Sequence, residues 1–99
     1  MNVSTVNKIA FAVVRTMDLE KAEEVPEGYI VTAWLQEGGV ASAEVVAALD
    51  LLVAGGLFVR KPGPLIARGP QFERIAALCR KAEEETMAAV LRFQGGRRV

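Results

Sequence analysis

The chain contains no histidine, and Cys79 is its only cysteine. Histidine is the side chain most often used for proton transfer near neutral pH, and zinc sites are built from clustered cysteines and histidines. A single cysteine also excludes a disulfide within the chain. We therefore expect no catalytic site, no metal and no cofactor, and we interpret the protein as non-enzymatic.

Long apolar runs are also missing. The most apolar stretch, residues 45–59, is interrupted by Asp50 and by Gly55-Gly56, and it is shorter than the roughly 20 residues of a membrane-spanning helix. Near the N-terminus, the apolar residues 9–14 are too few for the core of a signal peptide. Together with the unpaired thiol, these features predict a cytoplasmic protein without membrane association.

What is present is enough apolar surface for one folded domain. Of the 99 residues, 52% are hydrophobic and 24% are charged, a composition typical of globular chains of this size. The charges sum to zero but are unevenly placed. Residues 1–59 carry three basic and eight acidic side chains, whereas residues 60–99 carry nine basic and four acidic ones. This polarity would favour an anionic partner or the pairing of two copies.

Hydrophobic spacing predicts two helices in the first half of the chain. Apolar side chains recur every three to four residues within a helix that we expect over residues 4–24, with Ser4 as its N-cap and Pro26 beyond its end. A second helix is expected over residues 28–36, with Trp34 as a buried aromatic anchor.

A third helix and a hairpin should follow. Ser42 is a candidate cap for a helix of about 13 residues that ends at Gly55-Gly56. Residues 57–68 contain two short apolar runs around the turn Pro62-Gly63-Pro64, which predicts a two-stranded hairpin.

The last element predicted is a long helix. Pro70 suits the first turn of a helix over residues 70–94, and residues 95–99 are expected to form a flexible basic tail. We thus predict a mainly α protein with a small β-hairpin: one domain over residues 1–94, with a first helix within 1–25, a helix-turn-helix over 28–56, a hairpin over 57–68 and a C-terminal helix over 70–94.

This order of elements resembles the winged helix-turn-helix family. The resemblance covers residues 30–69. In it, residues 42–52 are similar to the third helix, Gly56-Leu57-Phe58-Val59-Arg60 to the start of the wing hairpin, and Leu65-Ile66-Ala67-Arg68-Gly69 to its end. The family implies binding of double-stranded DNA, with the third helix in the major groove and a basic wing on the phosphate backbone.

The outward face of the predicted third helix departs from that pattern. It offers Val46, Ala47 and Asp50 near Glu44, whereas reading of bases needs Arg, Lys, Asn or Gln, and carboxylates are repelled by phosphates. We expect Val46 and Ala47 to contact protein instead. Cationic side chains on the predicted wing and tail, together with a serine on the third helix, remain candidates for DNA contact: Ser42, Arg60, Lys61, Arg68, Arg97 and Arg98.

The predicted C-terminal helix carries the spacing of a helix-pairing seam. Apolar and small residues alternate at intervals of three and four, which is the heptad pattern of a coiled coil. We therefore expect a homodimer in which this helix supplies interface residues: Phe72, Ile75, Cys79, Ala82, Val90 and Phe93.

Two functions are consistent with these patterns. The first is a small dimeric regulator of transcription that binds DNA mainly through its basic wing and tail. The alternative is a protein–protein interaction module of winged-helix shape, such as a phage or mobile-element inhibitor that docks on host machinery without binding DNA. The resemblance supports the first, and the lack of cations on the third helix supports the second.

Overall fold

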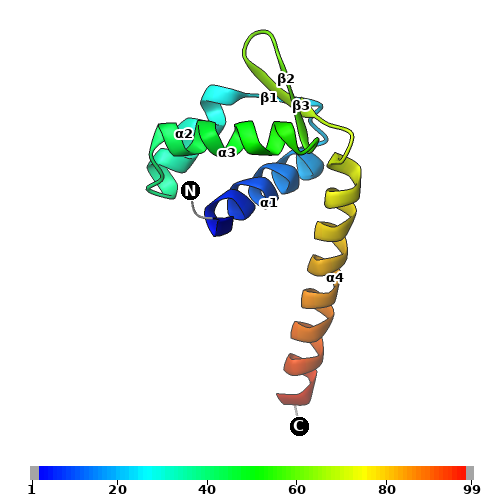
Figure 1. Cartoon of the computed structure of the whole chain (residues 1–99). Helices are drawn as coiled ribbons and strands as arrows, with labels where there is room; N and C mark the ends of the chain where they lie inside the picture. Colours follow the sequence, from blue (N-terminus) through cyan, green and yellow to red (C-terminus); the bar gives the residue numbers. More distant parts are fainter. Residues whose placement is uncertain (1–2, 98–99) are drawn as a thin grey trace.

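The computed structural model describes residues 3–97, with side chains as far as residue 93. A helical head is followed by one long helix that leaves it at an angle (Figure 1). The elements, in chain order, are α1 (Val3–Glu20), β1 (Glu24–Pro26), α2 (Glu27–Glu37), α3 (Ser42–Ala54), β2 (Phe58–Lys61), β3 (Leu65–Arg68) and α4 (Phe72–Arg97).

Helix α1 ends at Glu20, four residues before the predicted end. Lys21 adopts a left-handed conformation with φ 55°, its N–H donates to the carbonyl of Asp18 (3.3 Å), and the N–H of Ala22 donates to the carbonyl of Met17 (2.9 Å). This is the Schellman arrangement that commonly ends helices at a glycine. Because lysine stands where glycine is usual, the sequence held no signal for this end.

The short segment after α1 forms a strand that the sequence analysis missed. β1 pairs antiparallel with β3, and β2 pairs antiparallel with the other edge of β3, so the sheet order is β1-β3-β2. Val25 lies opposite Ile66. The predicted hairpin of β2 and β3 is confirmed, and β1 extends it to three strands. Pro26, which has no N–H to donate, is tolerated because β1 is an edge strand.

Helices α2 and α3 lie close to their predicted ranges, but the residues predicted as N-caps of α3 and α1 lie inside those helices. The N-cap of α3 is Ala41, and Ser42, predicted as the cap, is the first helical residue and makes no capping hydrogen bond. Similarly, α1 begins at Val3, one residue before the predicted cap Ser4.

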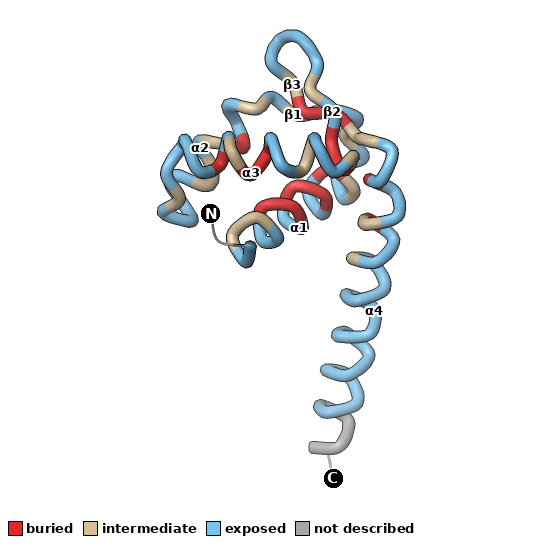
Figure 2. Tube along the Cα trace, in the orientation of Figure 1, coloured by how far each residue is buried: buried red, intermediate tan, exposed pale blue. Residues whose placement is uncertain are grey.

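The core lies where α1, α3 and the sheet meet the first turn of α4 (Figure 2). Its largest fully buried side chains include Phe58, Phe72, Ile9 and Met17. Trp34, expected as a buried anchor, is only half-buried against this cluster. Tyr29, on the same helix, has 65% of its surface exposed.

Helix α4 is longer than predicted and leaves the core early. It continues to Arg97, so residues 95–97 belong to a helix rather than to a flexible tail, while Arg98 lies outside the described residues. Every described side chain from residue 80 to residue 93 is exposed. The protein is therefore elongated, with extents of 56 × 28 × 22 Å.

Candidate interaction surfaces

The first candidate surface is the hairpin, where Arg60 already has acidic partners. Its Nη2 lies 2.6 Å from Oε1 of Glu27 at the start of α2, and its Nη1 contacts Oδ1 of Asp50 on α3. The hydrogen bond to Asp50 and, to a smaller extent, the hydrogen bond to Glu27 raise the pKa of the Arg60 guanidinium. Arg60 thus joins β2 to both helices, and its charge is compensated within the head.

Arg68, the second predicted wing cation, points into the head. Its Nε donates to the carbonyl of Ala22 (2.9 Å) and its Nη2 to the carbonyl of Met17 (3.2 Å). Its guanidinium also lies 4.5 Å from the ring centroid of Phe72. Arg68 satisfies carbonyls at the end of α1 and stacks on the first residue of α4, so it joins three elements.

Lys61 is the most exposed of the three predicted wing cations. Its side chain is 57% exposed, and its Nζ lies 3.8 Å from a carboxylate oxygen of Glu24. A contact this long between exposed groups stabilises little. Lys61 is therefore the cation of the hairpin that an external anion can reach most readily.

The outward face of α3 carries acidic and apolar side chains. Glu44 and Asp50 are exposed, Val46 is 38% exposed and Ala47 is half-buried. No lysine or arginine occurs within α3. This face is suited to contact with a protein surface rather than with phosphates.

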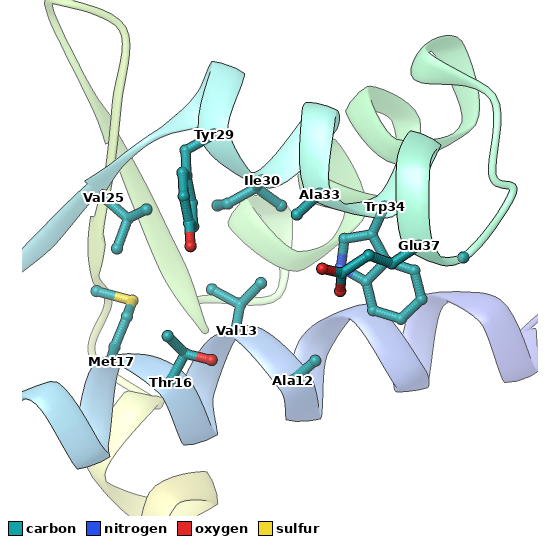
Figure 3. Close-up of a pocket in the computed structure, with 11 residues that line it drawn as sticks. Ala12, Val13, Thr16, Met17, Val25, Tyr29, Ile30, Ala33, Trp34 and Glu37 are labelled. Carbon is teal, nitrogen blue, oxygen red and sulfur yellow. The ribbon is translucent and has the colours of Figure 1, made fainter.

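A groove lies between α1 and α2. It has a volume of about 410 Å³. Side chains of α2, including Tyr29, Ile30 and Trp34, face Val13 and Met17 of α1 across it (Figure 3). The Trp34 ring is held over Gly38, where a Cβ would come within 2.7 Å of Trp34 Cε3. Trp34, predicted as a buried anchor, lies together with Tyr29 on the wall of an open groove.

The second groove lies between α1 and α4. It has a volume of about 460 Å³ and is lined by Phe11 and Arg15 of α1 and by side chains of α4. Nε of Arg15 lies 2.5 Å from Oε1 of Glu83, which ties the two helices together beside the groove. Phe11 is 50% exposed and Leu78 is 54% exposed, so the groove presents apolar surface to the outside.

The apolar wall of this groove continues along α4 as a single stripe. With 3.6 residues per turn, one face of the helix carries what we call the α4 stripe, which comprises Ile75, Leu78, Cys79, Ala82, Thr86, Ala89, Val90 and Phe93. Thr86 fits an apolar stripe because its Oγ1 donates to the carbonyl of Ala82 (2.9 Å) within the helix.

The predicted interface residues on α4 divide into two groups. Phe72 is 1% exposed, and its ring centroid lies 6.5 Å from that of Phe58, so this residue belongs to the core and not to an interface. Ile75 and Cys79 are half-buried, and Ala82, Val90 and Phe93 are exposed. The structure brings these five together on the α4 stripe.

Cys79 has the surroundings of an unreactive thiol. Burial is the main cause that raises its pKa, and the nearby carboxylates of Glu83 and Asp18 raise it further. The thiol is therefore protonated at neutral pH, and the thiolate that nucleophilic chemistry requires is scarce.

Among residues 3–97, no helix is both long and apolar enough to span a membrane. Within the same range, no cluster of three or more cysteine or acidic side chains is placed to hold a metal ion. Comparison with protein-family models, with curated proteins and with solved structures finds no match to this chain.

Proposed function

We propose that this chain is a non-enzymatic protein–protein interaction module of winged-helix type that works as a homodimer. The observation that carries the proposal is the α4 stripe, which continues for three turns beyond the last residue that packs on the head. In this exposed part it presents Ala89, Val90 and Phe93. A solvent-exposed apolar helix face of this length marks a contact with another helix.

The head supports a protein partner more strongly than a nucleic acid. The outward face of α3 is acidic and apolar, and Arg60 and Arg68 are engaged inside the head. A DNA-binding surface needs lysine and arginine side chains that can neutralise several phosphates. The charges that remain at this end of the molecule do not provide such a surface.

Two adjacent alanines test the role of α4. Ala89 lies on the stripe, whereas Ala88 lies on the opposite, charged face of the helix, and both are exposed. We expect Ala89→Glu to weaken dimerisation at least about tenfold, because a carboxylate would be desolvated in the interface. Ala88→Glu should leave the dimer intact. Light scattering after size-exclusion chromatography measures both masses, and equal behaviour of the two variants would contradict the proposal.

Double-stranded DNA is the second candidate partner, as for a transcriptional regulator. The observations in its favour are the helix-turn-helix followed by a hairpin, as the winged-helix resemblance implies, and the exposed Lys61 beside the tip of that hairpin. Exposed cations at a stiff turn suit backbone phosphates.

A mobility-shift assay at about 50 and 200 mM salt tests this candidate. If DNA is bound through the hairpin, affinity should fall steeply with salt, and Lys61→Glu should weaken binding about tenfold or more. Lys8→Glu, an exposed change on α1, is the matched control. An unchanged shift for Lys61→Glu, or none at the lower salt, would count against DNA binding by the hairpin.

A further inference from the structure

The monomer exposes more surface than a compact chain of its size. Its accessible surface is 6693 Å², whereas a compact protein of 10.7 kDa exposes about 5500 Å². The excess of roughly 1200 Å² exceeds the approximately 800 Å² that each partner buries in a standard protein interface. A second copy paired along α4 would have enough area to form a stable interface.

The size of the side chains changes along the α4 stripe in a way that suits pairing with the same stripe of a second copy. Small residues, Ala82, Thr86 and Ala89, occupy its middle and allow two helix axes to approach closely. At one end is the α1–α4 groove beside Phe11 and Leu78. At the other end is Phe93, with 62% of its surface exposed. The stripe therefore ends in a large aromatic group on one side and in an apolar groove on the other.

Charge along α4 distinguishes the two possible orientations. In a parallel pair, Glu85 of one copy and Arg92 of the other would stay seven residues apart, about 10 Å along the helix axis, so neither side chain would gain the other as a partner of opposite charge. In an antiparallel pair centred between residues 87 and 88, Ala82 faces Phe93 of the partner copy. That register also places Glu85 of each copy beside Arg92 of the other.

Within one chain, Glu85 and Arg92 are too far apart to form this contact. Glu85 and Arg92 are seven residues apart on α4, a separation of about 10 Å along the helix axis. Glu83 is already paired with Arg15. The antiparallel register thus gives Glu85 and Arg92 partners of opposite charge at two symmetric positions.

We infer that α4 pairs antiparallel with α4 of a second copy, so that Phe93 of each chain fills the α1–α4 groove of the other. The inference rests on the proposed function and specifies its interface. The pair is closed by a two-fold axis, which leaves no unpaired stripe for further growth. The two heads lie at opposite ends of the assembly.

Distances between spin labels test the orientation. Arg74 and Ala88 lie on the same outer face of α4, two heptads apart, and both are exposed. Each is changed to cysteine and labelled in a chain that also carries Cys79→Ser. Along the helix axis, the antiparallel pair separates the two labels at position 74 by about 40 Å and those at position 88 by about 2 Å. A parallel pair gives equal distances at both positions.

Charge reversal tests the register. Glu85→Arg and Arg92→Glu should each weaken dimerisation about tenfold, because attraction at two symmetric positions becomes repulsion. The double variant should return to the affinity of the parent chain. Lys81→Glu, on the outer face of α4, is the control and should leave the dimer unaffected.

The outcomes separate this inference from the proposed function. Unequal label distances together with rescue by the double variant support the antiparallel pair. A dimer with equal distances overturns the orientation but leaves the proposed function in place. A dimer with unequal distances and no rescue overturns the register. A chain that stays monomeric at all concentrations overturns both.

Discussion

Arginine side chains of the hairpin join parts of the head that are distant in the sequence. Arg60 joins β2 to α2 and α3 through two carboxylates, and Arg68 joins β3 to the end of α1 through two carbonyls. Hydrogen bonds from a charged donor stabilise more than those between neutral groups. These residues therefore fix the hairpin on the head.

At the residue scale, we predict that Arg68→Ala destabilises the protein by about 2 kcal/mol. The change leaves the carbonyls of Ala22 and Met17 without their side-chain donor and removes the guanidinium from the Phe72 ring. Urea denaturation followed by circular dichroism measures the loss.

Arg74→Ala is the matched control, because Arg74 is exposed and its Nε donates to Oε1 of Gln71, three residues earlier in the chain, rather than to a distant element. The free energy of unfolding of the Arg74→Ala variant should stay within about 0.5 kcal/mol of that of the parent chain. Equal stability of the two variants would show that the inward contacts of Arg68 do not support the fold.

At the element scale, the direction of α4 is set by a close backbone contact at Gly69. The Gly69 N–H donates to the carbonyl of Leu57 (2.9 Å), and the Gln71 N–H donates to the carbonyl of Gly56 (2.9 Å). A Cβ at Gly69 would lie 2.4 Å from the Gly56 oxygen and 2.8 Å from the Leu57 carbonyl carbon. A residue with a side chain at this position would force the end of β3 away from the end of α3.

We therefore expect Gly69→Ala to destabilise the protein by about 2 kcal/mol, a typical cost of overpacking against atoms that cannot move aside. Gly28→Ala provides the control, because a Cβ at Gly28 meets nothing within 4 Å and alanine is the better helix former in α2. Thermal denaturation of both variants would check this, and a Gly69→Ala protein as stable as Gly28→Ala would refute the packing account.

Elements with strong local signals were predictable from the sequence. The apolar spacing predicted a one-faced first helix, and the structure buries Ile9 and Met17 of α1 completely. Gly55-Gly56 predicted the end of α3, and the Pro62-Gly63-Pro64 turn predicted the hairpin.

The remaining features depend on contacts between distant residues. Strand β1 forms because the free edge of β3 is available to Val25, and no periodic pattern can be recognised in a strand of three residues. The inward contacts of Arg68 likewise require the end of α1 and the start of α4 to meet. Sequence analysis identified Arg60 and Arg68 as cations but not as side chains with internal partners.

At the scale of the whole molecule, the described side chains of α4 from residue 84 to residue 93 are all exposed in the monomer. Helical stability in proteins comes mainly from the packing of an apolar face, and isolated helices of this length are marginal in water. Pairing through the α4 stripe would supply that packing. A dimer would then place two heads far apart, each with its α3 face and its α1–α2 groove exposed to partners.

Sedimentation equilibrium of the unmodified chain over a range of micromolar concentrations tests the central claim most directly. The account predicts a reversible rise from the 10.7 kDa monomer to a species of twice that mass, with no larger assembly. A mass that stays at 10.7 kDa at every concentration would contradict it.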